Sequence, residues 1–349
     1  MLIPKQATIP ALVRAKPGAL DRMGIYAERE EFRRVILFFS QDLDRGLMAR
    51  LTDSLRSRNI QIAQETPVES ISFETVTELF RHIAANADAI IGFGGGKALD
   101  VAKYIAFLSR LPCLSVPTSL SNDGFCSPQS SLTIGDRRRP LASAVPFGVI
   151  LDTAVCLNAP EILWHSGIGD LVSKLTAVID WKMAFHAAGT PVDDFAALLS
   201  DASVHQFLAR PKRDLEGMRL LGTALLLNGI AMAICGTSRP ASGSEHLISH
   251  ALDSMSKQPR LHGLQVGVAT YLISLLQGQN SSRIAALFEA TGFWRAIASD
   301  PFERAEWLEA ARVASWIKSD FYTVLSSRDC LPEIETALHS DPNLRQCFH

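Results

Sequence analysis

Two hydrophobic patterns divide the chain, and the first occupies its N-terminal part. A continuous apolar run at 35–39 is typical of a strand buried on both faces, and further strands are predicted at 60–63, 88–92, 114–117 and 149–151. Apolar residues at helical intervals predict helices over 42–56 and 72–85, with Ser72 as the N-cap of the second. A hairpin is expected across 132–139. Strands that alternate with helices form a parallel sheet covered on both faces, with ligands at the carboxyl ends of the strands.

The second pattern begins near 152–160, where the strand-like runs end. Helical periodicity continues over 160–187, 192–208, 213–234, 241–255, 261–278 and 304–324. A chain of 349 residues is long enough for two domains or for one large core with an added layer. The change of pattern favours two domains, an α/β domain with a parallel sheet over 1–155 and an all-α domain over 156–349.

A triple glycine is the most informative local feature. Gly94-Gly95-Gly96 lies between the apolar run 88–92 and a segment with helical spacing from Leu99 to Ala106. Glycine lets the backbone approach a ligand closely and adopt positive φ, and the free N–H groups of a helix start favour an anion. The turn therefore predicts a pyrophosphate site, although many strand-to-helix turns use glycine for other reasons.

Charge and cysteine usage exclude several classes of protein. The formal net charge is −2 with both signs mixed, so nothing indicates nucleic-acid binding, and the basic run Arg137–Arg139 is typical of a solvated loop. Residues 1–5 lack the apolar core of a signal peptide. The stretch 220–235 is interrupted by polar and small residues, which predicts a buried helix and no membrane association. Six cysteines without CxxC pairs predict free thiols in the cytoplasm.

Four polar residues lie inside apolar helical segments of the second half. Asp170 follows a Gly-Ile-Gly sequence, His246 and His250 share a helix face one turn apart, and His262 precedes a glycine. One carboxylate and two or three imidazoles suit a divalent transition metal. A single helical histidine is more often a core or surface residue, and spacing alone does not show that these side chains converge.

Six motifs, which follow one another in the order found in a known family, carry a resemblance to that family. They read GFGGGKALDVAK at 92–103, VPTSLSNDGFCSP at 116–128, GIGDLVSK at 167–174, TAVIDWK at 176–182, GSEHLISHALD at 243–253 and HGLQVG at 262–267. With them the chain resembles the iron-containing alcohol dehydrogenase and dehydroquinate synthase superfamily, and within it the sn-glycerol-1-phosphate dehydrogenases. The resemblance covers most of the chain.

The resemblance implies that the N-terminal domain is Rossmann-like and that a metal and a dinucleotide bind in a cleft between the two domains. Asp170, His246 and His262 would hold one divalent metal, zinc before nickel or iron. NAD or NADP would contact residues of the glycine turn and of the segment after the next strand, namely Gly94, Gly95, Gly96, Lys97, Asp100, Thr118, Ser119, Ser121 and Ser127. Asp42 is either the acid that binds the ribose, which would favour NADH, or a helix N-cap.

Substrate contacts and proton transfer are expected at three further residues. Asp123 would bind a substrate hydroxyl or relay a proton, and its alternative is a turn residue before Gly124. His250 would relay the alcohol proton or contact substrate, and its alternative is a supporting partner of a ligand. Lys174 or Arg137–Arg139 would bind a phosphate, although Lys174 also fits a helix-surface lysine.

The implied activity is reduction of dihydroxyacetone phosphate to sn-glycerol 1-phosphate with NADH or NADPH, by a homo-oligomeric enzyme of phospholipid metabolism. Two departures from the family pattern, Leu264 in place of a glutamate and the absence of lysines over 140–146, leave another small polyol or ketone open as substrate. A carbon–oxygen lyase like dehydroquinate synthase is a further alternative. Such enzymes have a glutamate as the first metal ligand, whereas this chain has Asp170. A binding module without chemistry is disfavoured because all three ligand positions are filled.

Overall fold

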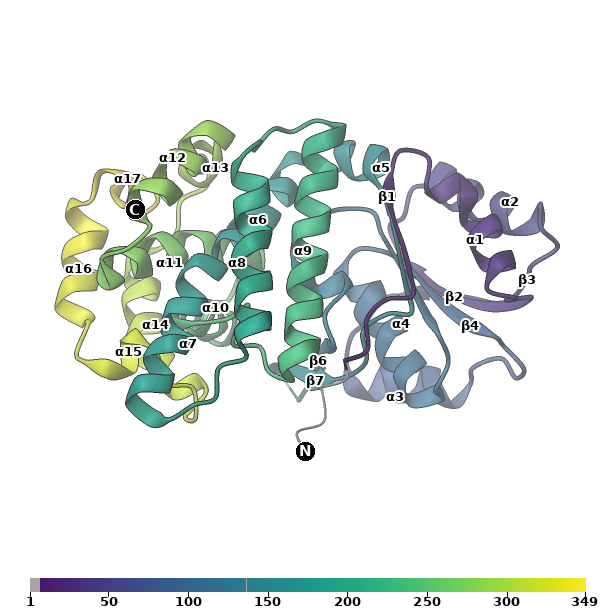
Figure 1. The fold of residues 1–349 in the computed structure, drawn as a ribbon, viewed down its shortest axis with the longest axis horizontal. Helices are drawn as coiled ribbons and strands as arrows, with labels where there is room; N and C mark the ends of the chain where they lie inside the picture. The colour runs from purple at the N-terminus through teal and green to yellow at the C-terminus, as the bar shows by residue number, and fades with distance from the viewer. Residues whose placement is uncertain (1–6, 136) are drawn as a thin grey trace. The chain divides into compact units, whose positions relative to one another are not determined.

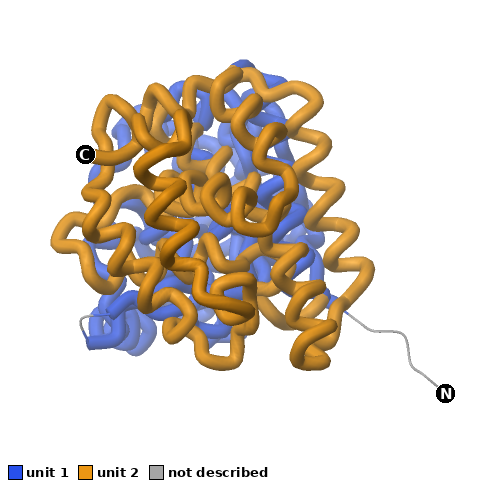
Figure 2. Tube along the Cα trace, turned by 90° about the vertical axis from the view of Figure 1, so that its left-hand side faces the viewer, with its two compact units in different colours: residues 1–159, 214–234 blue, residues 160–213, 235–349 orange. Residues whose placement is uncertain are grey.

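The computed structural model describes residues 7–135 and 137–349, which cluster into two compact units (Figure 2). Unit 1 comprises residues 1–159 and 214–234, and unit 2 comprises 160–213 and 235–349. The main division after Ala159 lies close to the predicted boundary between residues 155 and 156. The prediction did not include the return of the chain to unit 1 over 214–234.

Unit 1 is built on a parallel sheet, as predicted (Figure 1). Within the described residues its six strands follow the order β1-β8-β5-β4-β2-β3, and each neighbouring pair is parallel. The strands are β1 (Leu12–Lys16), β2 (Arg34–Ser40), β3 (Gln61–Val68), β4 (Ala89–Gly94), β5 (Cys113–Pro117) and β8 (Gly148–Asp152). The edge strand β1 was not predicted, because arginine and lysine interrupt its apolar residues.

Helices cover both faces of this sheet. They are α1 (Met23–Arg29), α2 (Arg45–Arg56), α3 (Phe73–Arg81) and α4 (Gly96–Ser109). Val35 and Leu37 of β2 share a core with α1 and α2, whereas Ile36 and Phe38 share a core with α3 and α4. Alternate residues of one strand are thus buried on opposite faces, which explains why the inner strands β2, β4, β5 and β8 are largely apolar.

The strand order reverses between β2 and β4. These strands are neighbours, and the chain leaves β2 toward β3 on one side before it returns through β4 to the other side. Ligands of open α/β sheets bind at such a reversal of strand order. Here β2 ends at Ser40 and β4 ends at Gly94, the first glycine of the predicted turn.

Two local predictions in unit 1 are confirmed and one interpretation is wrong. Ser72 caps α3 by accepting a hydrogen bond from the Thr75 backbone N–H at 3.1 Å. The strands β6 (Gln129–Ile134) and β7 (Arg137–Ala142) form the expected antiparallel hairpin. Arg137–Arg139 belong to β7 and not to a loop, although their side chains are exposed as expected of solvated residues.

The long apolar helix α9 (Leu215–Cys235) belongs to unit 1 for all but its last residue. It is long and apolar enough to cross a membrane, but 61% of its most apolar 18-residue stretch is buried inside the protein. Gly222 packs against the Leu151 side chain, and Gly229 packs against the Cys126 carbonyl. Helical periodicity predicts that such a helix is buried, but does not say against which core.

Unit 2 is helical, which confirms the predicted change of character. Its longer helices are α6 (Glu161–Val172), α7 (Lys174–Ala188), α8 (Asp194–Leu208), α10 (Ser244–Met255), α11 (His262–Gln277), α12 (Ser281–Thr291), α14 (Arg304–Ile317) and α16 (Leu331–Ser340). The predicted helix over 160–187 is two helices with a break at Ser173, and the one over 304–324 ends at Ile317. The helices α12 and α16 were not predicted.

Candidate metal centre and cofactor turn

The glycine turn has the backbone geometry that the sequence predicts. Gly94 ends β4 with φ of +129°, a conformation that side chains rarely adopt, and Gly95 is the N-cap of α4. The Gly95 N–H donates to the Ser40 hydroxyl at 2.9 Å, and a Cβ at position 94 would overlap this same Ser40 side chain. Ser40, which sequence reasoning missed, therefore holds the turn from the neighbouring strand.

The other two glycines leave room for a ligand. A Cβ placed on Gly96 would meet nothing within 4 Å, and one on Gly95 would meet only the Ser40 hydroxyl at 3.8 Å. The N-cap Gly95 has no side chain to cap the N–H groups that follow it in the first turn of α4, a helix of 14 residues. Lys97 is exposed in the first turn. The backbone here can therefore approach a pyrophosphate, which is the fit that a dinucleotide requires.

A buried lysine holds the segment that follows β5. Lys103 is 1% exposed, and its ammonium donates to the carbonyls of Gly124, Ser127 and Gln129 at 2.6, 3.0 and 2.6 Å. Asp100, predicted to contact the cofactor, is buried and faces this ammonium at 3.5 Å. Burial raises the pKa of Asp100, and the charge of Lys103 opposes that rise. Neither spacing nor composition indicates this arrangement.

The remaining predicted cofactor residues lie along this supported segment. The Thr118 N–H donates to the Gly94 carbonyl at 3.1 Å and so joins the end of β5 to the glycine turn. Ser119 and Ser121 are half-buried, whereas Ser127 is buried and accepts from the Gln129 N–H at 3.1 Å.

The structure places the two aspartates Asp123 and Asp42, each of which had a structural alternative to its predicted role. Asp123 begins the short 3-10 helix η2 (Asp123–Phe125), and Asn122 caps it. Asp42 is exposed between β2 and α2, but Asp44 is the N-cap of α2, with its carboxylate accepting from the Leu47 N–H at 3.0 Å. The N-cap interpretation of Asp42 is therefore wrong, and its ribose contact stays a prediction.

In unit 2 the structure brings the three predicted metal ligands together. Asp170 lies on α6, His246 in the first turn of α10, and His262 begins α11. One ligand atom from each lies within 4.8 Å of the others. Gly169 and Gly263 make this possible, because a Cβ on either would overlap the backbone of the opposite helix. The glycines beside Asp170 and His262 thus let α6 and α11 approach closely.

Lys174 is the counter-ion of Asp170 and is not a surface lysine. Its ammonium is fully buried and donates to the Asp170 carbonyl at 2.9 Å and to the Ser173 hydroxyl at 3.2 Å. It lies 3.5 Å from the Asp170 carboxylate. Burial would raise the pKa of Asp170, but the charge of Lys174 and the hydrogen bond to His246 hold it below its usual value. The carboxylate is therefore ionised and ready to bind a cation.

A glutamate that sequence reasoning missed orients His246. The Glu245 carboxylate, which is fully buried, contacts His246 Nδ1 at 2.9 Å and accepts from the Thr176 hydroxyl at 2.9 Å. His246 Nε2 faces the Asp170 carboxylate at 3.5 Å. A carboxylate behind Nδ1 is the usual support of a metal-binding imidazole. The signal was the Glu-His pair itself, but adjacent helical residues do not ordinarily face each other.

His250 completes a group of three imidazoles. Its ring centroid lies 6.2 Å from that of His246 and 5.9 Å from that of His262, with which it stacks at 24°. The shared helix face predicted for His246 and His250 is confirmed. His250 is half-buried and lies beside the three predicted ligands.

The donor set fits a divalent transition metal. Two imidazole nitrogens and one carboxylate oxygen match the ligand preferences of zinc, iron and nickel. A three-residue set also leaves coordination positions for an oxygen of a substrate.

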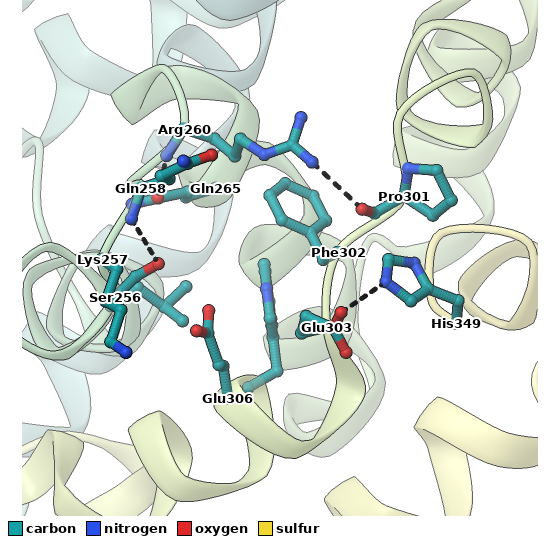
Figure 3. A pocket seen from close by; sticks show the side chains of 12 residues that line it. Ser256, Lys257, Gln258, Arg260, Gln265, Pro301, Phe302, Glu303, Glu306 and His349 are labelled. Carbon is teal, nitrogen blue, oxygen red and sulfur yellow. Dashed lines mark hydrogen bonds and ion pairs between the residues drawn. The ribbon is translucent and has the colours of Figure 1, made fainter.

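A pocket of about 300 Å³ opens elsewhere in unit 2 and contains none of these ligands (Figure 3). Phe302 and Trp307 contribute aromatic surface to it, and Gln265 and Arg260 also line it. Glu303 pairs with His349 there, as Figure 3 shows. We do not assign the main chemistry to this pocket, because it contains none of the three predicted ligands.

Comparison with known proteins places the chain in a family. Residues 14–160 match the family model of iron-containing alcohol dehydrogenases. The chain is 33% identical over 341 residues to the glycerol-1-phosphate dehydrogenase (NAD(P)+) of Aeropyrum pernix, which covers 95% of this chain and 96% of that protein. The protein of the same name from Methanothermobacter thermautotrophicus is 33% identical over 334 residues, or 93% of this chain and 94% of that protein.

A solved structure shares the fold. A probable glycerol dehydrogenase from Sinorhizobium meliloti matches with a TM-score of 0.73 over 95% of this chain and 98% of that one, at 19% identity. The sequence identity to the archaeal enzymes and the shared fold lead to the same assignment. The chain belongs to the glycerol-1-phosphate dehydrogenase family, within the iron-containing alcohol dehydrogenase superfamily.

Proposed function

We propose that the protein is a metal-dependent NAD(P) oxidoreductase that interconverts dihydroxyacetone phosphate and sn-glycerol 1-phosphate. The observation that carries this proposal is the convergence of Asp170, His246 and His262 within 4.8 Å, in a chain of this family. A chain that had kept the fold and lost its chemistry would have no reason to preserve a buried carboxylate, its counter-ion and two supported imidazoles.

Asp170, His246 and His262 would hold the metal, and zinc is the ion that we propose. When bound, such an ion supplies Lewis-acid polarisation of a carbonyl oxygen, and a nicotinamide supplies the hydride. The protein side chains prepare this chemistry. Lys174 keeps Asp170 ionised, and Glu245 holds the His246 ring with Nε2 toward the carboxylate.

The glycine turn would bind the pyrophosphate of the cofactor through the N-terminal N–H groups of α4. Thr118, Ser119 and Ser121 follow the next strand of the sheet, in the segment that we propose for the nicotinamide side. Asp42 would accept from the ribose 2′-hydroxyl, and its charge would disfavour the 2′-phosphate of NADPH.

Reduction of the ketone adds a hydride to carbon and a proton to oxygen. His250 would supply the proton, because it is half-buried and stacks on the His262 ring with the centroids 5.9 Å apart. Asp123 would bind a substrate hydroxyl. Its position is well defined, since Asn122 caps η2 and Lys103 binds the Gly124 carbonyl.

The phosphate of the substrate needs cationic or N–H partners. Arg137–Arg139 on β7 are exposed and have charge to offer, whereas the Lys174 ammonium is buried against Asp170 and Ser173. We therefore favour the arginines over Lys174 for this role. All six cysteines are free, which fits the proposed cytoplasmic location. A homo-oligomer and a place in phospholipid metabolism stay predictions.

Metal analysis combined with a substrate screen tests this function. The purified protein would be assayed for bound zinc, iron and nickel, and for oxidation of NADH and NADPH with dihydroxyacetone phosphate, dihydroxyacetone and small ketones. We expect the highest kcat/KM for the phosphorylated ketone and sn-glycerol 1-phosphate as product. A higher kcat/KM for an unphosphorylated ketone would leave only the dehydrogenase class, and full activity without metal would exclude the metal role.

A further inference from the structure

The two imidazoles of the ligand set have different supports. Nδ1 of His246 contacts a carboxylate, whereas Nδ1 of His262 contacts the hydroxyl of Ser249 at 3.1 Å. Ser249 is fully buried on α10. If Nε2 of His262 is to bind a metal, its Nδ1 must carry the proton, because a neutral imidazole has one protonated nitrogen. The Ser249 oxygen must then accept that hydrogen bond.

Gln265 fixes the Ser249 hydroxyl from the opposite side. The Arg260 backbone N–H donates to Gln265 Oε1 at 3.0 Å, and this settles the orientation of the amide because a backbone N–H only donates. Gln265 Nε2 therefore donates to Ser249 Oγ at 3.1 Å and to the Asp253 carboxylate at 2.9 Å. Gln265 is 2% exposed and lies at the edge of the pocket in Figure 3.

We propose that Ser249 and Gln265 are positioning residues for His262. They hold the ring so that its second nitrogen is available to the cation of Asp170 and His246, and the series His262–Ser249–Gln265–Asp253 ends on a carboxylate. A hydroxyl accepts two hydrogen bonds, and here His262 and Gln265 provide both. This inference rests on the proposed metal site. Partners of this kind typically contribute about 10- to 100-fold to metal affinity.

The test compares two variants with a matched control in the full chain. Ser249→Ala removes the acceptor for His262, and Gln265→Met removes the group that holds it. Ser274→Ala is the control, because Ser274 is also a fully buried serine but donates to the Tyr271 carbonyl at 2.6 Å on its own helix. Zinc affinity of each metal-free protein would be measured by competition with a chelator.

We expect zinc affinity to fall by about 10- to 100-fold in Ser249→Ala, by less in Gln265→Met, and not at all in Ser274→Ala. Because the expected defect is a lower metal affinity, excess zinc should restore kcat in Ser249→Ala. NADH affinity should be unchanged. The melting temperature of metal-free Ser249→Ala should match that of metal-free Ser274→Ala. If Ser249→Ala fails to fold, the proposal is tested by Gln265→Met, whose zinc affinity should be lower than that of Ser274→Ala.

Two results separate this inference from the proposed function. Unchanged zinc affinity in both Ser249→Ala and Gln265→Met, together with a large loss in His262→Ala, would overturn the positioning role alone. Unchanged zinc affinity in His262→Ala itself would overturn the metal site, and with it the proposed function.

Discussion

The glycine turn of unit 1 and the ligand cluster of unit 2 present polar groups in opposite ways. The turn presents backbone N–H groups of consecutive residues at the start of α4, and the Ser40 hydroxyl holds it by accepting a hydrogen bond from the Gly95 N–H. The cluster uses side chains from three helices, each backed by another buried polar group. A backbone site changes only when its conformation is strained or its space is filled. A side-chain site depends on every ligand and every support, so the two regions should respond differently to substitution.

His262→Ala should have the largest effect on function. Loss of one of three ligands should lower turnover by about 10³-fold or more, since Lewis-acid stabilisation contributes several kcal/mol. Bound metal should fall, while NADH binding, measured by fluorescence titration, should stay near the wild-type value because the glycine turn is untouched. Parallel losses of metal and NADH affinity would contradict the separation of the two regions.

Lys174→Met tests the buried support of Asp170. The variant keeps the bulk of the side chain and leaves the Asp170 carboxylate without its buried counter-ion, which should lower the free energy of unfolding of the metal-free protein by about 3–5 kcal/mol. Zinc should recover part of that loss, because its charge also neutralises Asp170. Denaturant unfolding with and without zinc measures both. If the variant instead has normal stability and a raised KM only for the phosphorylated ketone, Lys174 contacts phosphate.

Gly95→Val tests the turn by filling its space. Gly95 has φ of −86°, which valine adopts, and a Cβ there meets only Ser40 at 3.8 Å, so the variant should fold. Its side chain should block the N–H groups of α4 and weaken NADH binding by about 10- to 100-fold, which corresponds to one or two lost charged hydrogen bonds. Zinc affinity is the control and should not change. Normal NADH titration of the folded variant would place the pyrophosphate elsewhere.

The smallest effects should distinguish two neighbouring aspartates. Asp44→Ala removes the N-cap of α2 and should cost about 1 kcal/mol of stability, without altering cofactor preference. Asp42→Ala should leave stability unchanged, because Asp42 is exposed and is not the cap, but should raise the kcat/KM for NADPH relative to NADH. Thermal melts and kinetics with both cofactors would measure this, and an unchanged NADPH/NADH ratio would remove Asp42 from the ribose site.

The contrast between the two regions also explains how much could be predicted. The inner strands of unit 1 and the cap at Ser72 were evident because apolar runs and capping residues are local features of the sequence. The strand β1 was missed because arginine and lysine interrupt its apolar residues. The helix α9 was predicted as buried, but its place in unit 1 depends on the contacts of Gly222 and Gly229, which periodicity does not reveal.

By itself, the sequence determined the α/β and helical halves, the glycine turn and, through the family motifs, the identity of the three proposed ligands. These features depend on hydrophobic period, on backbone freedom and on contiguous motifs. Only the tertiary structure decided that Asp170, His246 and His262 converge, that Lys174 is buried as a counter-ion, and that Glu245, Ser249 and Gln265 lie behind the imidazoles. The physical reason is that helix packing, here through Gly169 and Gly263, sets which buried polar groups meet, and no spacing along the chain records that distance.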